Sequence, residues 1–266
     1  MMDQSSWASH TRDGLARCLD QDAVALLPLA AVEQHGDHLP LATDQIIADG
    51  VVGATLNRLP PEVTCLRLPT VAIGESTEHV NHPGTLSLSP TTFEAVLREI
   101  GQSVSRSGAR RLVMYSSHGG NMAAMDTAAL DLRAREGMLV VKTCHFDFPA
   151  IPGVFPEREW REGLHGGALE TALMLHLAPD RVNRQKLCHR PSIEFEALAD
   201  FRWVGAETRT ARFAWLAEDL HPAGVTGDAR LANPEAGEKL LSHYAETLAG
   251  IITETARFPL STFDQA

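Results

Sequence analysis

Two patterns of apolar and polar positions alternate along the chain. Short stretches rich in apolar residues occupy 22–33, 63–71, 109–117 and 138–146, and such runs are typical of strands buried on both faces. Segments whose apolar residues recur every three or four positions occupy 43–59, 89–108, 121–137, 165–179 and 233–258, and this spacing predicts helices. The alternation predicts an α/β fold in which helices cover both faces of a mostly parallel sheet.

Capping residues sharpen the predicted helix ends. Ser89 precedes Pro90 at the start of the helix over 89–108, an order that favours a helix start. We also expect Thr43 to cap the helix over 43–59. Gly137 follows the helix over 121–137, as glycine often does at a carboxyl end.

The remaining segments are less regular. The stretches 148–165 and 190–232 have no clear period, and we expect them to be irregular. No internal repeat, low-complexity tract or linker divides the sequence, so we expect a single domain over 1–266.

Charge and cysteine usage exclude several classes of protein. The formal net charge is −11, from 34 acidic and 23 basic residues, which argues against partners that are nucleic acids or anionic membranes. The sequence has no stretch of about 20 apolar residues, so no membrane span is predicted. The segment MMDQSSWASHTRDG lacks the apolar region of a secretion signal. No CxxC pair occurs. We therefore expect a cytoplasmic protein with reduced cysteines.

The stretch AVEQHGDHLPLATD, at 31–44, places carboxylates and imidazoles directly after the first predicted strand. Glu33 and His35 are two residues apart, so in an extended chain their side chains lie on one side. Asp44 lies near the start of the next helix, where a carboxylate is favoured. Its two oxygens would let it bridge two ions, and oxygen and imidazole ligands together suit zinc, manganese or iron.

Two further segments carry the same kinds of side chain. His118 follows the strand over 109–117 within SSHGGN, and His165 and Glu170 open the helix over 165–179. Ligands of open parallel sheets bind beyond the carboxyl ends of the strands, so these segments are placed to converge. Each motif alone has a simpler reading, as a polar loop, a tight turn or a helix start. Together they indicate a metal site.

Other polar residues of these motifs leave their roles open. Asp37 and His38 either orient the metal ligands or lie on the surface. Glu78, His79 and His82 lie in GESTEHVNHPGT, and we favour structural or pocket-lining roles for them over metal ligation.

The motifs together resemble the creatininase (creatinine amidohydrolase) family. The resemblance rests on EQHGDHLPLATD, EHVNHPGTLSLS, SSHGGN, HGGALETALM and GVTGDARLANPEAGEKL, which follow the family's order over roughly 24–240. It implies a three-layer α/β/α fold with a mostly parallel central sheet. It also implies a homo-oligomer, often a hexamer, and two divalent ions per subunit, which are zinc, manganese or, in some members, iron.

The resemblance also implies a ligand set for each ion. By motif match, Glu33, Asp44 and His118 would hold one ion, and Asp44 would bridge to a second ion held also by His35. Creatininase itself supplies a further glutamate two residues after the histidine of its GHYEN motif, where this chain has glycine. In members with the HGGN form, the glutamate of the HAGxxET motif replaces it, which here is Glu170.

This departure affects the expected substrate more than the expected reaction. Gly119 and Gly120 stand where creatininase has Tyr and Glu next to its substrate, and with Asn121 they are candidate substrate contacts. The family also includes formamide-cleaving deformylases and a peptidase of mycofactocin maturation, all of which cleave C–N bonds.

We therefore expect an amidohydrolase that cleaves a cyclic amide, a formamide or a small peptide-like substrate with a metal-activated water. His165 is the expected proton donor to the leaving nitrogen. The alternative is a non-catalytic scaffold or ligand-binding protein with the same fold. A complete set of ligand residues argues against that alternative.

Overall fold

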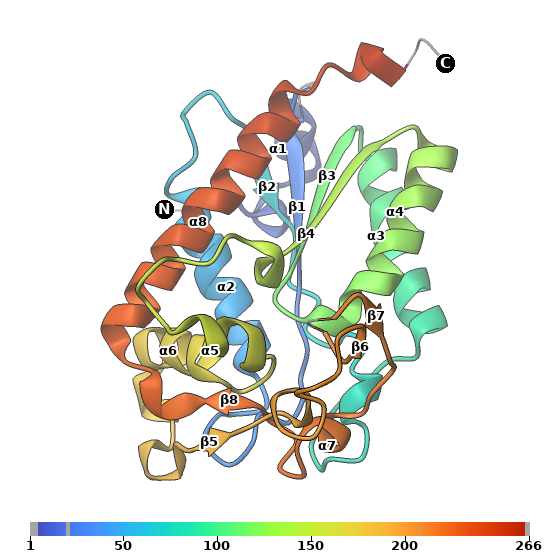
Figure 1. The fold of residues 1–266 in the computed structure, drawn as a ribbon. Helices are drawn as coiled ribbons and strands as arrows, with labels where there is room; N and C mark the ends of the chain where they lie inside the picture. The colour runs from blue at the N-terminus through green and yellow to red at the C-terminus, as the bar shows by residue number, and fades with distance from the viewer. Residues whose placement is uncertain (1–4, 20–21, 208, 264–266) are drawn as a thin grey trace.

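A four-stranded parallel sheet forms the centre of the molecule in the computed structural model, which describes residues 5–19, 22–207 and 209–263 (Figure 1). The strand order is β2-β1-β3-β4. These strands are β1 (Val24–Leu29), β2 (Cys65–Arg67), β3 (Arg111–Ser116) and β4 (Leu139–Cys144). All three pairings are parallel, which confirms the predicted sheet type.

Helices cover both faces of this sheet (Figure 1). One layer consists of α2 (Thr43–Leu56), α6 (Ala168–Leu177) and α8 (Pro234–Arg257). The other consists of α3 (Pro90–Arg106) and α4 (Met122–Glu136). The predicted helices over these five segments and the three-layer α/β/α class are therefore confirmed.

Alternate residues of the strands supply two separate cores. On β1, Val24 and Leu26 are fully buried against the layer of α2, α6 and α8. Ala25 and Leu27 are fully buried against α3 and α4. Because neighbouring side chains of a strand point to opposite faces, a strand between two helical layers must be apolar throughout. This requirement explains the continuous apolar run in the sequence.

The helix ends test the capping predictions. The Ser89 hydroxyl accepts the amide hydrogen of Thr92, and Gly137 adopts a left-handed conformation with φ of 67° after α4, so both predictions are confirmed. The predicted cap at Thr43 is wrong. Ala42 holds the capping position, and Thr43 is already helical, with its hydroxyl donating to the main-chain oxygen of Pro40.

Short elements occupy the two segments that were expected to be irregular. The first contains α5 (Glu157–Glu162), which the sequence pattern did not predict. The described residues of the second form short pieces, which include β5 (His189–Arg190), β6 (Val204–Gly205), β7 (Ala211–Arg212), α7 (Ala217–Leu220) and β8 (Gly227–Asp228). A further helix, α1 (Arg12–Cys18), precedes the sheet. Across the described ranges, no helix is both long and apolar enough to cross a membrane.

Close approach of α8 to α6 depends on a glycine. A Cβ atom at Gly237 would lie 2.0 Å from the main-chain oxygen of Ala172, a backbone atom that cannot turn aside. We expect Gly237→Ala to lower the free energy of unfolding by roughly 1–3 kcal/mol, because it forces apart two packed helices. Denaturant unfolding of the purified variant measures this change.

Gly250, on the same helix, is the matched control. Apart from the neighbouring backbone of α8, a Cβ atom there would meet no atom of the described residues within 4 Å. Gly250→Ala should therefore stabilise the protein by up to about 1 kcal/mol, since alanine has the higher helix propensity. Equal effects of the two substitutions would contradict the packing argument.

Candidate metal centre

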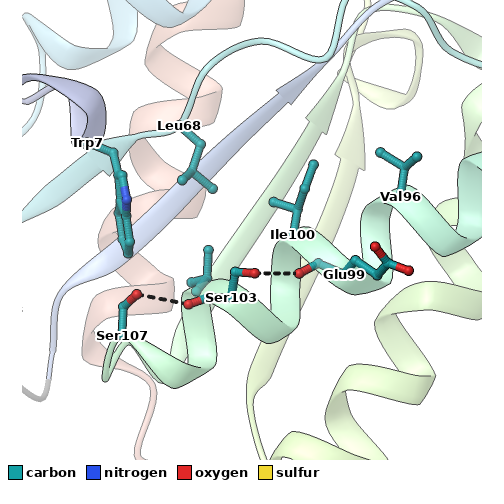
Figure 2. Close-up of a pocket in the computed structure, with 8 residues that line it drawn as sticks. Trp7, Leu68, Val96, Glu99, Ile100, Ser103 and Ser107 are labelled. Atoms are coloured by element: carbon teal, nitrogen blue, oxygen red, sulfur yellow. Dashed lines mark hydrogen bonds between the residues drawn. The ribbon is translucent and has the colours of Figure 1, made fainter.

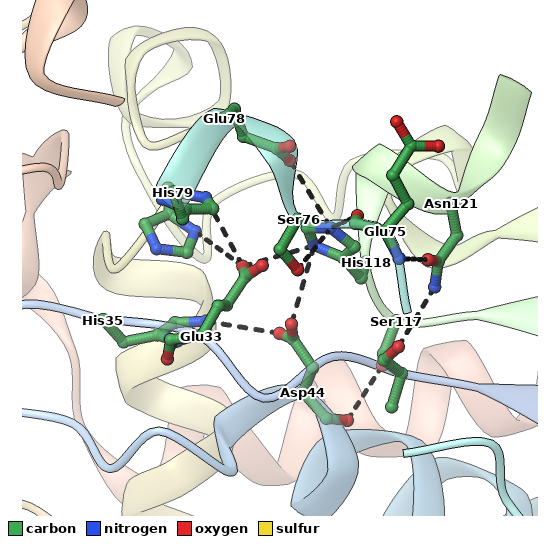
Figure 3. Close-up of polar contacts among 12 residues, drawn as sticks. Glu33, His35, Asp44, Glu75, Ser76, Glu78, His79, Ser117, His118 and Asn121 are labelled. Atoms are coloured by element: carbon green, nitrogen blue, oxygen red, sulfur yellow. Dashed lines mark hydrogen bonds and ion pairs between the residues drawn. The ribbon is translucent and has the colours of Figure 1, made fainter. Parts of the chain in front are cut away.

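The candidate site lies where β1 and β3 end, side by side at one edge of the sheet. The segment after β1 carries Glu33 and His35, and the segment after β3 carries His118. The Ser117 hydroxyl donates a 2.8 Å hydrogen bond to the main-chain oxygen of Asp44, which joins the end of β3 to the first turn of α2 (Figure 3). The sheet topology therefore brings together side chains that are far apart in the sequence.

One set of side chains lies on one side of Asp44. His118 Nδ1 lies 3.2 Å from Glu33 Oε1 and 3.6 Å from Asp44 Oδ2 (Figure 3). All three side chains are at least nine-tenths buried. Two carboxylates and an imidazole nitrogen thus face one another, as in the first ligand set that the motifs implied.

A second set lies on the other side of Asp44. His35 Nε2 is 3.3 Å from Asp44 Oδ1 and 3.6 Å from Glu170 Oε1. Glu170 comes from the first turn of α6, where its other oxygen accepts the amide hydrogen of Gly166. The two oxygens of Asp44 therefore face different groups of side chains, which is the arrangement that a bridging carboxylate requires.

Unsatisfied polar atoms show that these residues suit a cation. Both carboxylate oxygens of Glu33, His35 Nε2 and Asp44 Oδ2 are buried, and none has a hydrogen-bond partner among the described residues. Leaving such groups unpaired costs about 1–3 kcal/mol each, and more for charges. Ligand atoms of these three residues also lie within 4.8 Å of one another. Oxygen and nitrogen donors in this arrangement fit zinc, manganese or iron.

The electrostatics of the cluster favour positive charge. Burial opposes protonation of His118, but the carboxylate of Glu33 outweighs it and raises the pKa of His118 to about 10. Burial raises the pKa of Asp44 to about 7. For Glu170, burial is outweighed by His35, which lowers the pKa of this carboxyl to about 2. The crowded carboxylates thus draw a proton to a neighbouring imidazole, and a divalent ion would meet the same field.

Two histidine rings that lie close together flank Glu33. His165 Nδ1 is 3.6 Å and His79 Nε2 is 3.5 Å from Glu33 Oε1, and the centroids of the two rings are 4.1 Å apart. Burial lowers the pKa of His165 to about 4 and that of His79 to about 2, so both are neutral at pH 7. The sequence pattern placed His165 at the site but did not single out His79, because its loop has no period. The only signal was the histidine-rich GESTEHVNHPGT.

The loop that carries His79 also holds His118 in place. His118 Nε2 donates a 2.7 Å hydrogen bond to the main-chain oxygen of Glu75 and lies 3.4 Å from Glu78 Oε1. Asn121 Oδ1 accepts the amide hydrogen of Glu75, so Asn121 anchors this loop. A Cβ atom at Gly120 would lie 2.7 Å from Glu78 Oε1, so the loop packs where a longer side chain would project.

Three other predicted residues lie in different surroundings. Asp37 is exposed, which does not suit a residue that orients buried ligands. His38 is buried, and its Nε2 donates to the main-chain oxygen of Gly166 at 2.9 Å, so it supports the turn before α6. His82 Nε2 lies 3.4 Å from a carboxylate oxygen of Glu218, at the partly exposed end of its loop.

A cavity of about 740 Å³ opens onto the site. Its polar lining includes Glu78, His79, His118, Gly119, Gly120, His165 and Glu170, and its aromatic lining includes Phe146, Phe155, Trp160, Phe213 and Trp215. Figure 2 shows a second cavity, of about 410 Å³, between α3 and the segment of Trp7. Glu99 is the only charged side chain among the described residues that line it, so it offers no convergent set of ligands.

The protein is a three-layer α/β/α structure in which buried carboxylates and imidazoles cluster around Asp44 at one edge of the parallel sheet. Residues 8–252 match the family described as Creatininase: Creatinine amidohydrolase. The chain therefore belongs to the creatininase family.

Relatives of known name agree with this assignment. The mycofactocin precursor peptide peptidase of Mycolicibacterium smegmatis is 31% identical over 88% of this chain and 85% of its own length. The creatinine amidohydrolase of Pseudomonas putida is 30% identical over 90% of this chain and 92% of its own length.

Solved structures of creatininases share the fold. One, described as creatinine amidohydrolase (creatininase), has a TM-score of 0.77 at 26% identity and covers 97% of this chain and 100% of its own. Another, described as Creatininase Mn, has a TM-score of 0.75 at 28% identity and covers 94% of this chain and 98% of its own. A creatininase mutant of the Zn-Zn type has a TM-score of 0.74 at 27% identity and covers 94% of this chain and 97% of its own.

Proposed function

We propose that this protein is a metal-dependent hydrolase that cleaves a C–N amide bond of a small molecule or a short peptide. Two divalent ions would bind, one to Glu33, Asp44 and His118, and the other to Asp44, His35 and Glu170. The names of the relatives, a creatinine amidohydrolase and a precursor peptide peptidase, support this reaction class.

The arrangement around Asp44 is the observation that carries the proposal. Oδ1 is 3.3 Å from His35 Nε2, and Oδ2 is 3.6 Å from His118 Nδ1, so each oxygen faces a separate imidazole. A carboxylate buried for structural reasons alone would normally have hydrogen-bond partners. The unsatisfied Oδ2 favours a metal-binding role over a scaffold without bound ions.

His165 is the proposed catalytic residue. A bound divalent ion supplies a water of lowered pKa and polarises the carbonyl oxygen. His165 Nε2 donates its hydrogen to the main-chain oxygen of Gln34 at 2.6 Å, so Nδ1 has a free lone pair on the side of Glu33. His165 would therefore accept a proton at Nδ1 from the attacking water before it passes that proton to the leaving nitrogen. The C–N bond then breaks to give a carboxylic acid and an amine.

The size of the cavity bears on the substrate. A volume of about 740 Å³ lies in the range of sites for drug-sized ligands. Gly119 leaves part of the cavity wall open, because no atom of the described residues lies within 4 Å of where its Cβ atom would be, and aromatic side chains line much of the remainder. These features favour a peptide-like amide with apolar groups over a single small ring.

Metal removal and reconstitution test the proposed function. We expect the chelated protein to lose hydrolysis of an amide, formamide and dipeptide panel, and to regain it with zinc, manganese or iron. Saturating metal at about 100 times its Kd should stabilise the fold by about 2.7 kcal/mol for each ion bound. For a protein of this size, that corresponds to a rise in Tm of roughly 5–10 °C.

Two results would contradict the proposal. The first is a Tm that does not depend on added metal, because the ligands would then be satisfied without it. The second is a metal-bound protein that hydrolyses no member of the panel, which would favour the ligand-binding alternative.

A further inference from the structure

Gln34 lies between the metal ligands Glu33 and His35, and its side-chain amide has one possible orientation. Its Oε1 accepts the amide hydrogen of Gly36 at 3.0 Å. Its Nε2 donates a hydrogen bond to the main-chain oxygen of Gly224. Exchanging the amide oxygen and nitrogen would place donor against donor and acceptor against acceptor. The two backbone groups therefore fix the direction of the Gln34 amide.

The fixed amide determines which nitrogen of His79 has the proton. The second hydrogen of Gln34 Nε2 faces His79 Nδ1 at 3.0 Å. Because this nitrogen must accept a hydrogen bond, the proton of the neutral imidazole lies on Nε2. Only 2% of His79 is exposed, so water does not readily replace the amide as its partner.

The His79 Nε2–H group faces the centre of the site. It lies 3.5 Å from Glu33 Oε1, too far for a strong hydrogen bond, and His79 lines the large cavity. A neutral N–H group at a cavity wall, beside ligands for a metal, is placed to stabilise negative charge on a substrate oxygen.

His165 has a hydrogen-bond acceptor, rather than a donor, on the side that faces Glu33. Its ring lies next to that of His79 at an interplanar angle of 30°, but its Nε2 hydrogen is donated to the main-chain oxygen of Gln34. Its Nδ1 lone pair therefore faces Glu33, where His79 has an N–H group. Gln34 fixes both rings, one through its side chain and the other through its backbone.

We propose that His79 donates a hydrogen bond from Nε2 to the carbonyl oxygen of the substrate as that oxygen gains negative charge, and that Gln34 is the positioning residue that holds His79 in this tautomer. This inference rests on the proposed amide hydrolysis. It makes His79 a hydrogen-bond donor and His165 a proton acceptor, and the two rings lie side by side next to Glu33.

The tautomer is measured independently of activity. In protein labelled with ¹⁵N-histidine, the ring nitrogen shifts should show His79 protonated at Nε2, in both the metal-free and the zinc-loaded forms. In Gln34→Glu, a carboxyl oxygen would face Nδ1, so we expect the proton of His79 to move to Nδ1. The tautomer of His165 should not change, because its partner is a backbone oxygen. A wild-type His79 protonated at Nδ1, or one that loses its Nε2 proton when zinc binds, would overturn the inference.

Kinetics of two His79 variants test the role of the N–H group. We expect His79→Leu to lower kcat by roughly 10²–10³-fold, with little change in KM and with full metal content. His79→Gln should recover at least about tenfold of this loss, because its amide N–H reaches a similar position. His176→Leu, on the exposed side of α6, is the matched control and should keep wild-type kcat.

The outcomes separate this inference from the proposed function. An active wild type in which His79→Leu has normal kcat would refute the role of His79 and leave amide hydrolysis intact. Loss of metal from His79→Leu would also refute it, since His79 would then be a ligand. A wild type that binds metal but cleaves no amide would refute both the proposed function and the substrate contact.

Discussion

Asp44→Asn is expected to lose both metal ions and to lower kcat/KM at least ~10³-fold. An amide has a single ligating oxygen, and its NH₂ group would face one of the two imidazoles that now face Asp44. The substitution keeps the volume of the side chain, so it removes the bridge without opening a cavity. Loss of metal removes several kcal/mol of transition-state stabilisation, which corresponds to a factor of this size.

Metal analysis and unfolding of the metal-free proteins make this test specific. Because burial raises the pKa of Asp44 to about 7, its charge is unfavourable without an ion. Metal-free Asp44→Asn should therefore unfold at the same temperature as the metal-free wild type, or at a higher one. Asp37→Asn, at an exposed position in the same motif, should keep its metal and its activity. Two metal equivalents in purified Asp44→Asn would show that the assigned bridge is wrong.

The framework of this site was predictable from local patterns. Strands buried between two helical layers need continuous apolar runs, and β1 and β3 have them. Parallel strands end at a common edge, so Glu33 and His118 were expected to meet although 85 residues separate them. Their side chains do lie 3.2 Å apart. The sequence placed Glu170 in a third segment expected to converge on this edge, but its role as a ligand came from the motif resemblance.

Loop geometry limited the rest of the prediction. His79 reaches Glu33 because its loop folds over the end of β3, held by Asn121. Neither the path of an aperiodic loop nor the direction of the Gln34 amide can be read from spacing, since both depend on backbone groups such as Gly224. The cap at Thr43 failed for a similar reason, because the turn that begins at Pro40 starts the helix one residue early.

His165→Ala is expected to retain both metal ions and to lose turnover by ~10²–10⁴-fold, the range for general acid–base catalysis. The free Nδ1 of the imidazole is the group removed, and the proposed ligands Glu33, His35 and Glu170 remain. Metal analysis with steady-state kinetics separates the two effects. Added imidazole should restore part of kcat, because it can occupy the space left by the ring. His176→Ala, an exposed histidine of the same region, should change neither quantity.

The alternative role for His165 is metal ligation, because its ring nitrogen also lies within reach of Glu33 and of the pair His35 and Glu170. Substitution of a metal ligand removes bound metal, whereas substitution of a proton carrier removes turnover and leaves the metal in place. Loss of an ion from His165→Ala, with no rescue by imidazole, would make this residue a ligand and would require another base. Retained metal, lost kcat and rescue by imidazole would instead support the role of His165 as a base. The 2.6 Å hydrogen bond to the main-chain oxygen of Gln34 uses the only proton of the neutral ring, so Gln34 holds the Nδ1 lone pair toward the reacting water.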